Sequence, residues 1–152
     1  MSTAIEQARP IIVLYAEDND NDIELTRISF QQARSGIALH HVDNGEDCLA
    51  FLRRQGRYSA SPKPDLLLLD INMPRKNGFE VLKEIAADAE LCGLPVIVLT
   101  TSSADEDIAA MYKLRCSSYI TKPVNFDKFA AVIKSITDYW FTVVALPEPA
   151  RK

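Results

Sequence analysis

The sequence predicts an α/β fold in which a parallel sheet is covered by helices on both faces. Four consecutive leucines lie between Asp65 and Asp70, and this apolar run is too short for a helix but suits a strand buried on both faces. Ile11–Tyr15 and Leu94–Leu99 are further strand-like runs. Because such runs alternate with segments of helical spacing, we expect parallel strands joined by right-handed crossovers.

The other elements each have a local signal. Acidic and amide side chains around Asp20 suit the start of a helix, which Gly36 ends. Asn44-Gly45 and Asn77-Gly78 mark turns into two more helices, and an apolar stripe runs through the last helix to Trp140. We therefore predict strands at 11–15, 37–42, 66–69, 94–99 and 117–121, and helices at about 20–34, 46–55, 79–87, 104–114 and 125–140.

Composition narrows the class of protein. A chain of 152 residues that is 47% hydrophobic and 25% charged suits one globular domain, and a formal charge of -4 without a basic face argues against nucleic-acid binding. No signal peptide or membrane-spanning run is evident, so we expect a cytoplasmic protein without membrane attachment. The three cysteines, Cys48, Cys92 and Cys116, are widely spaced, which argues against a disulfide framework and fits a reducing compartment. The only histidines are the adjacent His40 and His41, so a zinc site is not expected.

Polar side chains gather where the predicted strands end. Glu17 and Asp18 follow the first strand, Asp70 follows the leucine run, and Thr100 and Lys122 follow the last two strands. In an open parallel sheet these carboxyl ends form a ligand-binding edge. Clustered carboxylates repel unless a hard cation such as Mg²⁺ relieves them, and Lys122 can pair with Asp70 or with a phosphoryl oxygen. The set suits phosphoryl transfer to a carboxylate, which gives an aspartyl phosphate.

The same residues form motifs in a familiar order: Glu17-Asp18, Leu69–Pro74 followed by Gly78, Leu99-Thr100, and Tyr119–Pro123. Together they resemble the receiver domain of two-component response regulators, over about residues 10–140. The resemblance implies a flavodoxin-like (βα)5 fold with strand order 2-1-3-4-5. It also implies a signalling switch rather than an enzyme, with only its own autophosphorylation and autodephosphorylation chemistry.

The resemblance further assigns roles to individual residues. Asp70 corresponds to the acceptor of a phosphoryl group from a sensor histidine kinase. Asp18, Asp70 and the backbone carbonyl of Asn72 correspond to Mg²⁺ ligands, with Glu17 acting through water. Lys122 and Thr100 would bind the phosphoryl group, and Tyr119 would be the aromatic switch that follows Thr100. Two departures from the family pattern are Asn77-Gly78 in place of Asp-Gly, and Arg115-Cys116 in place of Gly-Ala.

The domain layout expected from the sequence is a tail at 1–9, a receiver domain at 10–141 and an extension at 142–152, without an output domain. The terminal run Tyr139–Pro147 carries more apolar side chains than a last helix needs. It resembles the single-domain regulators that serve bacterial phytochromes, which dimerise through this region. We therefore expect a bacteriophytochrome partner and a homodimer, although the run could instead fold back over its own core.

Three other functions match part of the sequence pattern, but each lacks a residue or segment that it requires. A phosphatase of the haloacid dehalogenase type also uses an aspartate nucleophile, but its general acid two residues later would be Asn72, which cannot do acid-base work. A flavin carrier would need a hydroxyl-rich loop after the first strand, where this chain is acidic. The Asp18-x-Asp20-x-Asp22 spacing imitates an EF-hand, yet Ile23 and Ser29 replace its glycine and final glutamate.

Overall fold

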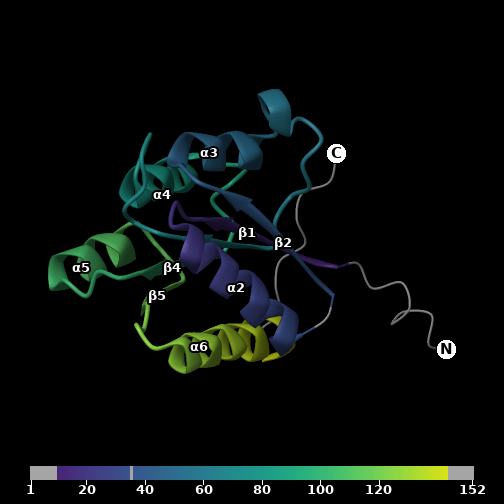
Figure 1. The fold of residues 1–152 in the computed structure, drawn as a ribbon. Helices are drawn as coiled ribbons and strands as arrows, with labels where there is room; N and C mark the ends of the chain where they lie inside the picture. Colours follow the sequence, from purple (N-terminus) through teal and green to yellow (C-terminus); the bar gives the residue numbers. More distant parts are fainter. Residues whose placement is uncertain (1–9, 35, 144–152) are drawn as a thin grey trace.

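In the computed structural model, which describes residues 10–34 and 36–143, the strands form one parallel sheet in the order β2-β1-β3-β4-β5. This confirms the flavodoxin-like fold, with helices between the strands (Figure 1). The strands are β1 (Ile11–Ala16), β2 (Ile37–Val42), β3 (Leu66–Leu69), β4 (Val96–Thr100) and β5 (Ser118–Thr121). The helices are α2 (Asp20–Ala33), α3 (Gly45–Arg53), α4 (Gly78–Ala87), α5 (Asp105–Lys113) and α6 (Phe126–Asp138), with short turns η1 (Gly56–Tyr58) and η2 (Tyr139–Val143).

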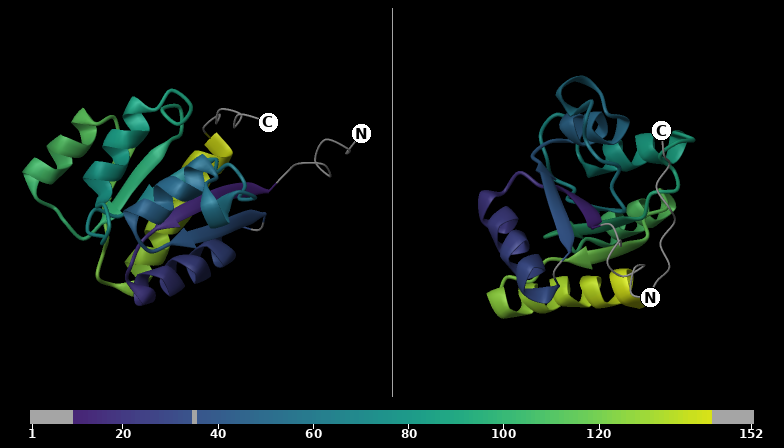
Figure 2. Two further views of the ribbon diagram at one scale, coloured as in Figure 1. Left: turned by 90° about the horizontal axis from the view of Figure 1, so that it is seen from above. Right: turned by 90° about the vertical axis from the view of Figure 1, so that its right-hand side faces the viewer.

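Two hydrophobic cores lie on opposite faces of the sheet. Successive residues of a strand point to opposite faces, so neighbouring β1 side chains belong to different cores. Leu14 packs with α3 and α4, and Tyr15 packs with α2 and α6. All four leucines of β3 are fully buried, as expected for a central strand. Figure 2 shows α2 and α6 on one side of the sheet and α3 and α4 on the other.

Asparagine begins four of the five α-helices in the described chain. The side-chain oxygens of these asparagines accept hydrogen bonds from backbone N–H groups three residues later, which satisfies donors that a helix start leaves unpaired. Glu80 also accepts a hydrogen bond from the Asn77 backbone N–H, so α4 begins with a full capping box. The four caps are Asn19, Asn44, Asn77 and Asn125, at 2.8–3.0 Å.

Several element ends differ from the predictions. The strand expected from Leu94 begins at Val96, because Pro95 has no N–H for the ladder. The helix expected to reach 55 ends at Arg53, and Arg54 turns the chain in a left-handed conformation (φ 57°). The last α-helix ends at Asp138 and continues as the π-helical turn η2. These differences at the ends of elements do not change the order of the strands or of the helices.

Arg115 and Cys116, which depart from the family pattern, form the turn that ends α5. Arg115 adopts a left-handed φ of 72°, a conformation that glycine accepts more readily. Its N–H donates to the Tyr112 carbonyl (3.0 Å), and the Cys116 N–H donates to the Met111 carbonyl (3.1 Å). This pair of bonds is a Schellman motif, and Cys116 packs with Met111 in the core. The chain therefore makes the turn before β5 without glycine.

The expected domain boundaries stay predictions. The N-terminal tail at 1–9 and residues 144–152 of the expected extension lie outside the described residues. Within 10–34 and 36–143, no helix is both long and apolar enough to cross a bilayer.

Gly78 shows how closely the first turn of α4 approaches the end of β3. Its N–H donates to the Ile71 carbonyl at 2.8 Å, and an added Cβ would lie 2.5 Å from the Asp70 carbonyl oxygen and 2.8 Å from the Ile71 Cα. Both neighbours are backbone atoms, so the chain itself would have to move.

We predict that Gly78→Ala lowers the free energy of unfolding by about 2 kcal/mol, within the range for overpacking. Urea denaturation measures this loss. Gly93→Ala is the matched control, because a Cβ at Gly93 meets no atom within 4 Å. Equal stability of the two variants would contradict the close approach.

Candidate functional site

Three carboxylates meet at the carboxyl edge of the sheet. Ala16 of β1 is paired with Leu69 of β3, and the Asp70 N–H donates to the Ala16 carbonyl at 3.1 Å, so the acidic residues that follow the two strands are adjacent. One oxygen from each of Glu17, Asp18 and Asp70 lies within 4.8 Å of the others. Glu17 and Asp70 are buried and Asp18 is exposed. The predicted convergence of these residues is present.

Lys122 brings the buried positive charge to this cluster. It follows β5, its backbone N–H donates to the Thr100 carbonyl (2.7 Å), and its side chain is only 4% exposed. Its ammonium donates to Glu17 Oε1 and, at 2.8 Å, to Asp22 Oδ2. Within the described residues Lys122 forms no ion pair with Asp70, which was one of its two expected partners. It pairs with Glu17 and Asp22 instead.

Burial and neighbouring charges together set the pKa values of Lys122 and Glu17. Burial opposes the charged form of Lys122, but the Glu17 and Asp22 carboxylates outweigh it and hold the lysine pKa above its usual range. Burial raises the pKa of Glu17 to about 7, although the Lys122 ammonium acts in the opposite direction. Lys122 therefore stays charged between its acidic partners.

Glu17 is fixed by protein donors at both oxygens. Oε1 accepts the Tyr15 hydroxyl at 3.1 Å in addition to Lys122, and Oε2 accepts the Asn19 N–H at 3.2 Å. Asp70 uses one oxygen, Oδ1, to accept the Ile71 N–H at 2.8 Å. The carboxylates of Asp18 and Asp70 are thus less occupied than that of Glu17, which leaves them as the better candidates for direct ligand contact.

Thr100 and Tyr119 lie on the neighbouring strands of the same edge. Thr100 is fully buried, and its Oγ1 has no hydrogen-bond partner within the described part of the chain. Tyr119 is half-buried on β5, and its hydroxyl donates at 3.0 Å to the carbonyl of Ser102, in the loop after Thr100. Tyr119 therefore contacts the segment that follows Thr100.

Asn72 lies on the loop that follows Asp70, and the start of α3 holds this loop. The Gly45 N–H donates to the Pro74 carbonyl (3.3 Å) and the Glu46 N–H to the Arg75 carbonyl (2.8 Å). A Cβ on Gly45 would lie 2.1 Å from the Lys76 carbonyl oxygen, so only glycine permits this contact. Asn72 itself is exposed. In the sequence, Asn44-Gly45 indicates a turn but carries no signal of this contact.

Two residues of the site had no role assigned from the sequence. The sequence pattern places Tyr15 in a buried strand and Asp22 in an acidic run, and neither pattern indicates a role in the site. Their signals were a hydroxyl two residues before Glu17, on its face of the strand, and a carboxylate in the first turn of the following helix. The hydrogen bond from Tyr15 to Glu17 and the ion pair of Asp22 with Lys122 became visible only in the fold.

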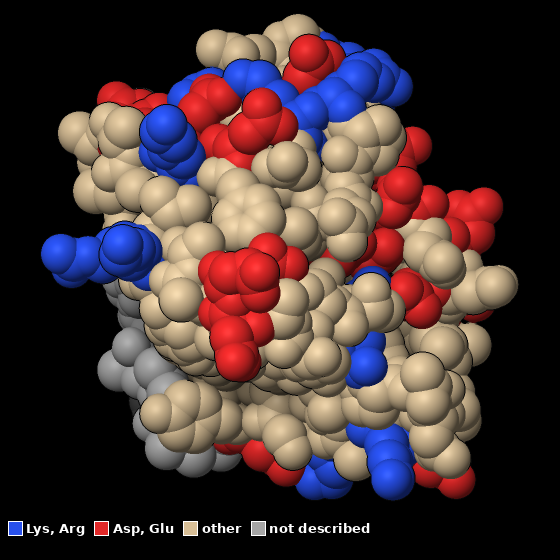
Figure 3. All heavy atoms as spheres, turned by 90° about the vertical axis from the view of Figure 1, so that its left-hand side faces the viewer, with Lys and Arg blue, Asp and Glu red and all other residues tan. Residues whose placement is uncertain are grey.

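Exposed acidic side chains surround the carboxyl edge of the sheet. The loop after β1 contributes Asp18, and the first turns of α2 and α5 contribute Asp20, Asp105 and Glu106. Figure 3, which views the molecule from the side toward which the strands end, shows acidic side chains gathered on this surface. Such a field favours the approach of cations.

This arrangement places an acidic cluster and a buried ammonium at the carboxyl edge of a doubly wound sheet, and the chain belongs to the response regulator receiver domain family, which it matches over residues 13–134. Its relatives include the response regulator Rcp1 of Synechocystis, 37% identical over 93% of this chain and 97% of Rcp1. The polar-differentiation response regulator DivK of Brucella anthropi is 32% identical over 83% of this chain and 95% of DivK. Receiver domains are phosphoacceptors rather than conventional enzymes.

Solved structures agree with this assignment. The Mn²⁺-bound form of Rcp1 has a TM-score of 0.87 at 37% identity, covering 91% of this chain and 100% of that one. The phosphorylated cyanobacterial phytochrome response regulator RcpA has a TM-score of 0.88 at 36% identity, covering 91% and 99%. The bacteriophytochrome response regulator RtBRR has a TM-score of 0.73 at 31% identity, covering 93% and 84%.

The unpartnered hydroxyl of Thr100 predicts a stability cost. A buried polar group without a partner costs about 1–3 kcal/mol, and valine has nearly the same shape without the hydroxyl. We expect Thr100→Val to raise the free energy of unfolding by about 1 kcal/mol. Urea denaturation provides the measurement, with Thr101→Val as the control because Thr101 is exposed. A destabilised Thr100→Val variant would show that the hydroxyl is already satisfied.

Proposed function

We propose that this chain accepts a phosphoryl group on Asp70 from the phosphohistidine of a sensor histidine kinase. The observation that carries the proposal is the meeting of Asp70 with two further carboxylates and a buried ammonium at one sheet edge. One Asp70 oxygen already accepts the Ile71 N–H, which leaves the other to attack phosphorus. A P–O bond to Asp70 forms as the P–N bond to histidine breaks, and the histidine ring leaves with the electron pair.

A divalent cation fits this site. The carboxylate oxygens of Glu17, Asp18 and Asp70 are hard donors gathered at one point, the donor type that Mg²⁺ prefers. We propose that Asp18, Asp70 and the Asn72 backbone carbonyl hold Mg²⁺ directly and that Glu17 acts through water, since both Glu17 oxygens already have protein donors. When bound, the cation supplies neutralisation of the negative charge on the phosphoryl oxygens.

The remaining residues divide between binding and switching. Lys122 supplies a point charge, and the unpartnered Thr100 hydroxyl supplies a donor for a phosphoryl oxygen. Movement of Thr100 toward that oxygen would displace the loop to which the Tyr119 hydroxyl is bonded through Ser102. Phosphorylation would thereby bias a two-state element made of this loop, α5 and Tyr119. Water attack on the acyl phosphate would reset it.

We propose a bacteriophytochrome as the kinase. The support comes from the relatives, because RcpA and RtBRR are named as phytochrome and bacteriophytochrome response regulators and match this chain over nearly its whole length.

The phosphoacceptor is tested by intact mass after incubation with a small phosphodonor and Mg²⁺. The native chain should gain the mass of one phosphoryl group, and Asp70→Asn should gain none, because an amide cannot attack in this way. Asp20→Asn is the control, since Asp20 is an exposed carboxylate in the same acidic run. Removal of Mg²⁺ by a chelator should abolish the gain. Equal labelling of Asp70→Asn and the native chain would disprove the assignment.

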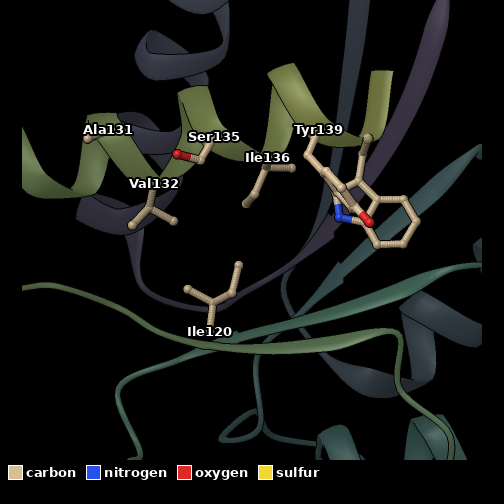
Figure 4. Close-up of a pocket in the computed structure, with 7 residues that line it drawn as sticks. Ile120, Ala131, Val132, Ser135, Ile136 and Tyr139 are labelled. Carbon is tan, nitrogen blue, oxygen red and sulfur yellow. The ribbon is translucent and has the colours of Figure 1, made fainter. Parts of the chain in front are cut away.

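We also propose a homodimer through the last helix. An apolar pocket of about 330 Å³, which Trp140 helps to line, opens between β5 and α6. Tyr139 stands at one end of it (Figure 4). Its lining is almost entirely apolar, and Tyr139 is 55% exposed although it is a large aromatic residue. Aromatic side chains are enriched in protein interfaces, which favours a second copy as the occupant. Residues 144–146 of the expected interface lie outside the described residues.

Sedimentation of point variants tests the dimer. Tyr139→Glu should shift the chain toward the monomer by at least tenfold in dissociation constant, about 1.4 kcal/mol, because a charge would be buried without a partner. Val124→Glu introduces the same charge at a fully exposed apolar residue, on the loop before α6, and should leave association unchanged. A dimer unaffected by Tyr139→Glu would place the interface elsewhere.

A further inference from the structure

Lys122 is held on the α2 side of the site by a closed ring of hydrogen bonds. Its ammonium bonds Glu17 Oε1 and Asp22 Oδ2. Asn19 completes the ring, because its N–H donates to Glu17 Oε2 (3.2 Å) and its side-chain oxygen accepts the Asp22 N–H (3.0 Å). The ring fixes the lysine relative to the first turn of α2. It leaves Asp70 outside.

The two carboxylates that hold Lys122 are not equivalent. The Glu17 side chain is 2% exposed and also accepts the Tyr15 hydroxyl and the Asn19 N–H, so it is committed to its place. The Asp22 side chain is 24% exposed, and within the described residues its carboxylate accepts only the Lys122 ammonium. Water can replace the lysine at Asp22 more easily than at Glu17. The contact with Asp22 is therefore the one that can be given up.

We infer that Asp22 is a positioning residue that holds Lys122 away from Asp70 and competes with the phosphoryl group for its ammonium. The inference rests on the proposed phosphorylation of Asp70. Lys122 forms no ion pair with Asp70 in the described chain. A phosphoryl group on Asp70 would attract the ammonium from the α2 side of the site, which would weaken the Asp22 ion pair. Asp22 thereby lowers the occupancy of the phosphorylated form. It also couples phosphorylation to the first turn of α2, where Asp22 lies.

The test uses the full chain with Mg²⁺ and beryllium fluoride, a tetrahedral anion that stands in for the phosphoryl group. Its affinity is measured by ¹⁹F NMR titration. Asp22→Asn should bind the anion about threefold more tightly than the native chain, the size expected for loss of one partly exposed ion pair. A merely damaged site would bind more weakly, so the direction of change separates positioning from structural harm. Asp22→Ala, which retains a good helix former, should change affinity in the same direction.

Asp20→Asn is the matched control, because Asp20 carries the same charge in the same turn of α2 but is exposed and forms no ion pair in the described chain. Its affinity should equal that of the native chain. The gain in Asp22→Asn should persist at about 0.5 M salt, because the lysine is buried and screening acts mainly on exposed charges. A general field effect would instead fade with salt and appear in both variants.

Failure of this inference can be told apart from failure of the proposed function. If the native chain binds the anion and Asp70→Asn does not, the phosphoacceptor site stands whatever Asp22 does. Equal or weaker binding by Asp22→Asn, or a gain shared with Asp20→Asn or lost in salt, would then overturn the role of Asp22 alone. If native binding is absent or survives in Asp70→Asn, both proposals fail.

Discussion

The carboxyl edge of this sheet depends on one buried ammonium. Glu17, Asp18, Asp22 and Asp70 place four carboxylates around the ends of β1 and β3, and Lys122 supplies the buried positive charge among them. Burial of a charge is costly unless it is paired and hydrogen-bonded. The contact joins residues 105 positions apart in the sequence, so it forms only after β5 has taken its place beyond β4. The acidic site therefore forms only once the strands have taken this order.

Backbone geometry sets the second constraint on the site. The loop after Asp70 passes so close to α3 and α4 that Gly45 and Gly78 have no room for a side chain. Arg75 and Lys76, within this loop, adopt left-handed φ angles of 49° and 81°, which side-chain-bearing residues rarely do. Such conformations persist where surrounding contacts hold them. The first turns of two helices thus hold the loop that carries Asn72.

The sequence was sufficient for the features that depend on periodicity and local turn chemistry. The leucine run, the Asn-Gly turns before two helices, and the positions of the five site residues at strand ends follow from such rules, and the structure shows each of them: Glu17, Asp18, Asp70, Thr100 and Lys122. These rules could not predict the ion pair of Asp22 with Lys122, because it depends on how α2 is oriented against β5. The same holds for the docking of Gly45 on the Lys76 backbone. The π-helical turn after Asp138 arises where a strong apolar stripe gave no local stop signal.

The two Asn-Gly pairs have a consequence for the chemical ageing of the protein. Asn-Gly is the sequence most prone to deamidation, in which the glycine nitrogen attacks the asparagine side chain to close a five-membered imide. Here the Gly45 and Gly78 nitrogens donate to the carbonyls of Pro74 and Ile71, and the side chains of Asn44 and Asn77 accept helix N–H groups. Ring closure would require both sets of bonds to break. The folded chain therefore shields its most labile amides with the contacts that shape its site.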